Sequence, residues 1–367
     1  MLQQTEPLAE TPAGTVRGVR DGSGERYRAL PYAAAPTGAG RFAPPDPHPG
    51  WAGVRDATRP APTAPQPSRD FGRLDMSPYF GPGWVPGDEY LTVDVHTPAA
   101  DGARRPVMVF VHGGGFVTGS SRAALHDGSA FVRDGVVLVT VNYRLGIPGF
   151  LDLAGAPPNR GLLDVLAALS WVQATIAVFG GDPGNVTVFG QSAGATLTGA
   201  LLAAPEAGGL FRRAVMQSGT GTGAFTPEQA GRVTAAAAAA LGVEPTAEAF
   251  APVPDEHFLA VLPALAGLDL RTRTATDPLA GLSPFGLVLP AQPADSLADG
   301  PAAGVDLLIG TNSAEGHLYV VPQGGLESTT EADLSALAAG VETCTWYGGD
   351  ADATTSGGRE MRERGGV

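Results

Sequence analysis

Short apolar runs separated by polar, Gly-rich and Pro-rich segments recur along the middle of the chain. Their length and their content of β-branched residues are typical of strands that are buried on both faces. Between these runs, residues 159–179 carry apolar residues near helical spacing, which predicts a helix that covers a sheet. Strands that alternate with helices predict an α/β fold with a doubly wound, mostly parallel sheet. The apolar runs lie at residues 91–95, 106–112, 136–143, 186–189, 214–217 and 306–310.

The flanking segments depart from this alternation. Residues 14–67 are rich in Pro and Gly but contain short β-like pieces, which predicts an N-terminal edge segment with a small sheet. A low-complexity linker is the alternative, and the aromatic residues within the segment argue against it. Residues 226–303 are helical and rich in loops, as expected of an insertion that walls a pocket.

The helical periodicity stops near residue 340. We therefore expect one domain over residues 1–340, incomplete at its C-terminus, and a disordered or aberrant tail over residues 341–367. An out-of-frame end of the gene would produce such a tail.

The composition and net charge of the chain exclude several classes of protein. A hydrophobic content of 43% with 16% charged residues indicates a globular protein, and a net charge of −14 disfavours nucleic acid and anionic membranes as partners. The single Cys344 excludes internal disulfides and thiolate metal clusters, and nothing in the chain calls for a cofactor. With no apolar run of transmembrane length and no leader pattern, we expect a cytoplasmic protein with no membrane span; the oligomeric state stays open.

The pentapeptide at residues 190–194 has the pattern G-x-S-x-G and lies between an apolar run and a small-residue helix start. In that setting a serine can occupy a sharp strand-to-helix turn, with its hydroxyl exposed as a nucleophile. The motif alone could equally be an ordinary turn. Its context favours acyl transfer by Ser192.

A second motif, His112-Gly113-Gly114-Gly115-Phe116, directly follows another apolar run. Acyl transfer needs donors directed at the oxyanion that forms on the carbonyl oxygen, and a glycine run lets backbone N–H groups approach closely. Lipases and esterases place such a loop beside the nucleophile. We expect an oxyanion hole formed by the N–H groups of Gly114, Gly115 and Ala193; a flexible turn is the alternative.

With these two motifs in order, the chain resembles the type-B carboxylesterases, relatives of the cholinesterases with the α/β-hydrolase fold. The resemblance runs from about residue 12 to about residue 340. It implies that Ser192 is the nucleophile, that Glu315 is the acid that orients the base, and that Ser218 lies in the surroundings of the triad. Glu315 follows an apolar run, so it is expected at a carboxyl end of the sheet; a solvated loop carboxylate is the alternative.

The resemblance also implies two structural ion pairs, Arg41 with Asp88 and Arg144 with Asp164. In addition, Tyr90 stands where secreted relatives carry a disulfide cysteine, which fits a reducing compartment.

The histidine that would act as the catalytic base is the one expected residue of this site that the sequence does not supply. The resemblance implies the order nucleophile, acid, histidine, but His317 is the sole histidine after Glu315, and the sequence ends 52 residues beyond that acid. Two residues after the acid, His317 has poor geometry for bridging it to Ser192, and His112 is expected to anchor its loop. We therefore expect the catalytic histidine to be absent. Four further histidines are expected to be solvated or structural, in surface-like segments: His48, His96, His126 and His257.

The resulting expectation is a serine hydrolase that cleaves small-molecule carboxylic esters through an acyl-enzyme, without a cofactor. The alternative is a catalytically impaired hydrolase-fold protein that binds a ligand or is an inert fragment. A protease or amidase on the same fold shares the nucleophile and stays open.

Overall fold

The computed structural model describes residues 6–68, 74–279, 281–297, 302, 304–322 and 324–332. The chain divides into two compact units, residues 1–323 and residues 324–367. In the second unit the described part contains α11 (Gly325–Ser328). The predicted domain boundary at residue 340 and the tail at residues 341–367 lie outside the described residues, so both stay predictions.

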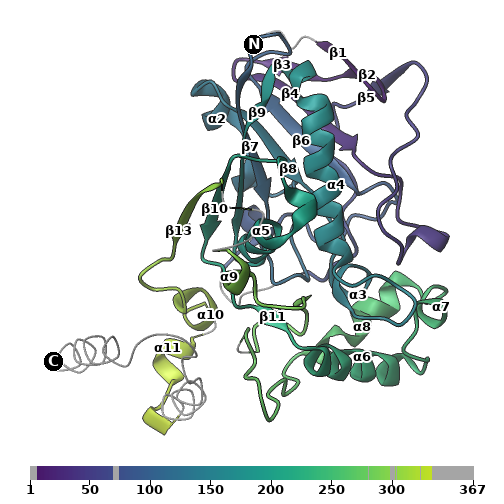
Figure 1. The fold of residues 1–367 in the computed structure, drawn as a ribbon, viewed down its shortest axis with the longest axis vertical. Helices are drawn as coiled ribbons and strands as arrows, with labels where there is room; N and C mark the ends of the chain where they lie inside the picture. The colour runs from purple at the N-terminus through teal and green to yellow at the C-terminus, as the bar shows by residue number, and fades with distance from the viewer. Residues whose placement is uncertain are drawn as a thin grey trace, which may run out of the picture. The chain divides into compact units, whose positions relative to one another are not determined.

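An eight-stranded sheet forms the centre of the first unit, in the order β13-β10-β9-β7-β8-β6-β4-β3 (Figure 1). Neighbouring strands from β13 to β8 are parallel, whereas the pairs from β8 to β3 are antiparallel. This confirms the predicted mostly parallel α/β sheet. The strands are β3 (Val19–Asp21), β4 (Gly24–Pro31), β6 (Thr92–Thr97), β7 (Arg105–Val111), β8 (Val137–Val141), β9 (Gly181–Gln191), β10 (Arg213–Gln217) and β13 (Asp306–Gly310).

The N-terminal segment forms the expected edge structure. A three-stranded sheet joins β1 (Leu8–Thr11), β2 (Gly14–Arg17) and β5 (Val54–Asp56) in the order β1-β2-β5. Two further strands of this segment, β3 and β4, extend the central sheet instead. The segment is therefore part of the α/β unit and not a linker.

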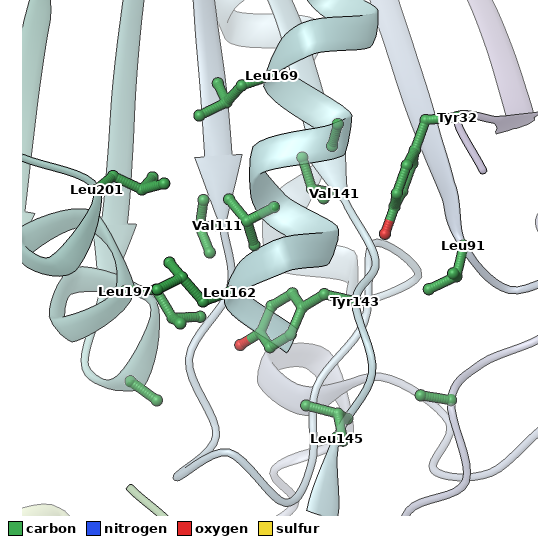
Figure 2. Close-up of a cluster of buried hydrophobic side chains, with 14 of the residues drawn as sticks. Tyr32, Leu91, Val111, Val141, Tyr143, Leu145, Leu162, Leu169, Leu197 and Leu201 are labelled. Carbon is green, nitrogen blue, oxygen red and sulfur yellow. The ribbon is translucent and has the colours of Figure 1, made fainter. Parts of the chain in front are cut away.

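Two helices contribute apolar side chains to the buried core beside the sheet: α4 (Arg160–Thr175) and α5 (Ala193–Ala203). Leu162 and Leu169 of α4 lie with Val111 and Val141 of the sheet, and Leu197 of α5 lies in the same cluster (Figure 2). Residues 160–179 would pass for a membrane span by length and by a mean hydropathy of 1.8, but half of that stretch is buried within the protein. Such burial is what a helix covering a sheet requires.

The predicted insertion contains α6 (Pro227–Leu241), α7 (Ala247–Phe250) and α8 (Asp255–Leu265), which lie together in Figure 1. A capping box begins α6: the Thr226 hydroxyl accepts from the Gln229 N–H, and the Gln229 side chain accepts from the Thr226 N–H. The Thr234 hydroxyl donates to the Asp152 carbonyl, which ties the insertion to the segment after β8.

The remaining elements are short and connect these parts. They are α1 (Ser77–Phe80), α2 (Ser129–Arg133), α3 (Gly146–Phe150), α9 (Pro293–Ser296), α10 (His317–Val320), η1 (Gly38–Gly40), η2 (Ala124–His126), η3 (Ile176–Phe179), η4 (Pro205–Ala207) and the paired strands β11 (Ala224–Phe225) and β12 (Leu287–Val288).

One of the two expected ion pairs is present. Arg144 and Asp164 are fully buried, and the Arg144 guanidinium donates to both carboxylate oxygens at 2.7 and 2.8 Å. The expected pair of Arg41 with Asp88 is wrong: Arg41 pairs with Asp255 at the start of α8. The Arg41 side chain thereby joins the N-terminal segment to the insertion, a partnership between segments over 200 residues apart.

The turn from β9 into α5 depends on glycines with no room for a side chain. A Cβ atom on Gly194 would lie 2.0 Å from the Val111 carbonyl oxygen, and one on Gly190 would lie 2.3 Å from the Gly194 carbonyl oxygen. Gly231 in the exposed face of α6 meets nothing within 4 Å.

Substituting Gly194→Ala should therefore destabilise the fold by ~3 kcal/mol or more, because backbone and not a flexible side chain must move. The matched change Gly231→Ala should stabilise by about 0.5–1 kcal/mol, since alanine is the better helix former. Urea unfolding of both variants checks this. Equal effects of the two changes would contradict the steric account.

Asp94 of β6 gives a pH-dependent prediction. It is 3% exposed, and burial raises its pKa to about 6, although it accepts hydrogen bonds from the Ala29 N–H and the Ser121 hydroxyl. Because this exceeds the unfolded value of about 3.9, the contribution of Asp94 to stability is present below pH ~4 and is lost as the pH rises through 6. Thr140 of β8 lies opposite Asp94 in the sheet, and its buried hydroxyl has no hydrogen-bond partner among the described residues.

Asp94→Asn should consequently raise the unfolding free energy at pH 8 by on the order of 2 kcal/mol, with no gain at pH 4. The amide keeps an acceptor for Ala29 and can offer an N–H to Thr140. Chemical unfolding of both proteins at the two pH values measures the difference. A gain of equal size at pH 4 and pH 8 would argue against an ionisation effect.

Candidate active site

Ser192 stands at the turn between β9 and α5, as the pentapeptide predicts. Its backbone has φ 55° and ψ −123°, a left-handed conformation that is strained for a residue with a side chain. The Ser192 N–H donates to the Gln217 carbonyl of β10 at 2.9 Å, and its carbonyl accepts from the Thr196 N–H. These two bonds hold the serine at the carboxyl end of the sheet.

The glycine loop after β7 lies directly beside this turn. A Cβ atom on Gly113 would lie 2.7 Å from the Gln191 carbonyl oxygen and 3.1 Å from the Ser192 Cβ. Only a glycine lets the two backbones approach so closely. Ala193 is the first residue of α5, where a backbone N–H has no partner inside the helix.

His112 anchors the loop, as expected. Its ring is fully buried and stacks on Tyr143 with centroids 4.4 Å apart, while the Tyr143 hydroxyl donates to the His112 carbonyl. Burial lowers the pKa of His112 to about 3, so the imidazole is neutral at pH 7. Its Nδ1 lies 2.8 Å from the Gly113 carbonyl oxygen, and because a carbonyl can only accept, Nδ1 carries the proton.

The loop carbonyls fix where the loop N–H groups point. In a trans peptide the C=O of one residue and the N–H of the next point in opposite directions. The bond from His112 to the Gly113 carbonyl therefore sets the direction of the Gly114 N–H. In the same way, the Val117 and Thr118 N–H groups donate to the Gly114 carbonyl at 3.2 Å, which sets the direction of the Gly115 N–H.

Glu315 lies five residues beyond the end of β13, at the same end of the sheet as Ser192. Its carboxylate accepts hydrogen bonds from the Ser218 hydroxyl and from the Asn312 N–H, and the Ser218 bond is the main reason that its pKa lies below the usual value. Ser218 follows β10, and its own backbone has φ 53°. The next residue, Gly219, approaches the Ser192 carbonyl: a Cβ there would lie 3.0 Å away. Ser192, Ser218 and Glu315 thus follow three neighbouring strands.

Within the described part of the chain, neither Ser192 nor Glu315 has a hydrogen bond with a histidine. His317 begins α10, and its N–H donates to the Ala314 carbonyl. His257 is exposed and His48 pairs with Glu89. His96 lies in the interior and not in a surface-like segment: it is 5% exposed and accepts from the Gly128 N–H, which is the structural role of the two that were expected.

A cavity of about 170 Å³ adjoins the turn and the loop; its lining includes Gly113, Gln191, Tyr79 and His126. His126, which was expected to be solvated or structural, is half-buried against Phe110, and burial lowers its pKa to about 4. The Tyr79 hydroxyl donates to the Gln191 side chain, which ties α1 to the residue before the serine. A larger cavity of about 570 Å³ lies around Asp94 and does not reach Ser192.

Sequence reasoning missed two further contacts of the loop. Gln66 bonds to Thr118 and Gly119, and Ser283 of the insertion donates to the Gly115 carbonyl at 2.6 Å. Neither residue carries a local signal, because its partners are distant in sequence. Among the described residues, no group of three or more His, Cys, Asp or Glu side chains could hold a metal ion.

Comparison with known proteins identifies the family of this chain. The model of the carboxylesterase family matches residues 5–340. Para-nitrobenzyl esterase of Bacillus subtilis is 38% identical over 90% of this chain and 67% of its own length. Carboxylesterase 3 of Homo sapiens is 36% identical over 89% of this chain and 58% of its own.

Solved structures give the same result. A carboxylesterase of Geobacillus stearothermophilus superposes with a TM-score of 0.76 at 36% identity, covering 90% of this chain and 66% of that protein. The chain thus spans about two thirds of the length of these relatives, or less. The family match over most of the chain, the identity to its members and the shared α/β-hydrolase fold together establish that this chain belongs to the carboxylesterase family.

Proposed function

We propose that this chain is a serine hydrolase of carboxylic esters. The observation that carries the proposal is the strained turn at Ser192, held against the glycine loop at Gly113. A serine in this position presents its hydroxyl beyond the sheet, and the loop supplies backbone donors beside it.

In the proposed reaction, Ser192 Oγ attacks the ester carbonyl and its proton passes to a base. The oxyanion is stabilised by the N–H groups of Gly114, Gly115 and Ala193. The C–O bond to the alcohol then breaks, the alcohol takes the proton, and an acyl-enzyme remains. Water attacks that ester, releases the acid and restores the serine hydroxyl.

Glu315 is the proposed acid of the site, and Ser218 holds it. Its pKa is lowered, so the carboxylate stays ionised at pH 7 and can orient a histidine and stabilise its charged form. The proposal assigns no base, because none of the histidines in the described ranges bonds to Ser192 or Glu315.

The proposed substrates are small-molecule esters, and the cavity beside Gly113 is small and largely apolar in its lining. The names of the relatives, such as para-nitrobenzyl esterase and phenmedipham hydrolase of Pseudarthrobacter oxydans, support a small substrate. A cytoplasmic location is part of the proposal and is supported by the single cysteine of the sequence.

A fluorophosphonate probe tests the nucleophile. The wild-type chain should be labelled at Ser192 and should hydrolyse a p-nitrophenyl ester, whereas Ser192→Ala should lose both the label and the part of the turnover that depends on the serine. Mass spectrometry locates the adduct. Equal labelling and turnover in both proteins would refute the proposal and leave a ligand-binding hydrolase fold or an inert fragment.

Glu315→Gln tests the acid. Removing the charge should lower kcat by on the order of tenfold, less than in a complete triad, because none of the histidines in the described ranges bonds to Glu315. Because Glu315 is exposed, the melting temperature should change little. Glu206→Gln, at another exposed carboxylate, should leave both quantities unchanged, and a comparable loss of kcat there would count against a specific role for Glu315.

A further inference from the structure

The glycine loop is held from outside by one buried side chain of the N-terminal segment. Gln66 is 1% exposed, and its carboxamide makes four hydrogen bonds. Its Oε1 accepts from the Thr118 hydroxyl and from the Gly119 N–H, both at 2.8 Å. Its Nε2 donates to the carbonyls of Gly119 and Ala64, at 3.1 and 3.2 Å. Both lone pairs of Oε1 and both N–H groups of Nε2 are thereby engaged.

The residues that Gln66 holds are those that orient the loop. The Thr118 N–H donates to the Gly114 carbonyl, and a Cβ atom on Gly114 would lie 2.0 Å from the Thr118 carbonyl oxygen. Gly119 has φ 115° and approaches the His112 ring, where a Cβ would lie 2.4 Å from Nδ1. Gln66 thus holds Thr118 and Gly119, and Thr118 in turn is hydrogen-bonded to Gly114, so the Gln66 amide is linked to the glycine run through the backbone.

A second side chain holds the glycine run at Gly115. Ser283 is 3% exposed, donates to the Gly115 carbonyl at 2.6 Å and accepts from the Phe285 N–H at 3.1 Å. The carbonyls of Gly113, Gly114 and Gly115 are thus all hydrogen-bonded, so the peptide planes that carry the N–H groups of Gly114, Gly115 and Phe116 cannot rotate without breaking these bonds. Each broken bond would leave buried polar groups unsatisfied, which is costly.

We propose that Gln66 is a positioning residue for the oxyanion donors. By fixing Thr118 and Gly119, its carboxamide keeps the Thr118 N–H on the Gly114 carbonyl and so directs the Gly115 N–H. This proposal rests on the proposed ester hydrolysis for its catalytic consequence, whereas the structural part, that Gln66 immobilises the loop, does not. The function of Gln66 is exerted through the backbone, since its side chain does not reach the reacting atoms.

The test compares Gln66→Met with Gln229→Met. Methionine has a similar shape but cannot replace the hydrogen bonds. Gln229 is an equally buried glutamine whose amide donates to the Leu270 and Thr276 carbonyls of the insertion, away from the loop. Gln66→Met should speed amide hydrogen exchange of residues 112–119 by at least about tenfold, and Gln229→Met should not.

The same pair is tested by catalysis. Gln66→Met should lower kcat, and the rate of fluorophosphonate labelling, roughly 10- to 100-fold with little change in KM, because misdirected donors weaken the transition state. Thr118→Val removes one bond to Gln66 while keeping the side-chain shape, and should give a smaller loss of the same kind if Gln66→Met fails to fold.

The outcomes separate the two proposals. Unchanged exchange at residues 112–119 in Gln66→Met and in Thr118→Val would overturn the positioning role, as would an equal loss of kcat in Gln229→Met. If the wild-type chain is not labelled at Ser192, the proposed hydrolysis fails, and the exchange experiment still decides whether Gln66 holds the loop.

Discussion

The close contact between the first turn of α5 and the end of β7 is the constraint on which the site depends. Because Gly194 lies against the Val111 carbonyl, the helix starts closer to the sheet than a residue with a side chain would allow. The strand must then turn sharply, and Ser192 takes up the strain in a left-handed backbone conformation. The same closeness brings the loop at Gly113 against Ser192. One steric arrangement therefore places both the proposed nucleophile and the proposed oxyanion donors beside it.

Buried hydrogen bonds and one buried ion pair hold these segments in place. Arg144 donates to Asp164 and also to the carbonyls of Arg41 and Ala43, so a single guanidinium joins the segment after β8, helix α4 and the N-terminal segment. Removing one partner of such a buried pair typically costs about 3–5 kcal/mol, because the other charge stays buried. The N-terminal segment, which also carries Gln66, is thereby fixed to the unit that holds the site.

The sequence predicted those features that local chemistry determines. The strand at residues 306–310 and the turn at Ser192 lie where the patterns placed them, since alternation, β-branching and glycine spacing act within a few residues. Contacts between distant segments were not predictable in this way. Arg41 bonds to Asp255 instead of Asp88, and Gln66 reaches a loop over 50 residues away from within a Pro-rich stretch that carries no catalytic pattern.

The site is assembled from segments that must each be positioned independently. Ser192 depends on β9 and α5, and the proposed oxyanion donors depend on the loop after β7. Glu315 depends on Ser218, which follows β10, and on Asn312, which follows β13. Glu315 accepts from three donor groups of Ser218 and Asn312 although its side chain is exposed, so its orientation comes from hydrogen bonds and not from burial. His112 differs from Glu315 in that burial keeps its ring neutral. The one ring proton, on Nδ1, is donated to the Gly113 carbonyl and so fixes the peptide plane between Gly113 and Gly114. The Glu315 carboxylate is ionised and the His112 imidazole is neutral at pH 7. The charges at this site and the directions of its backbone N–H groups are therefore set before any substrate binds.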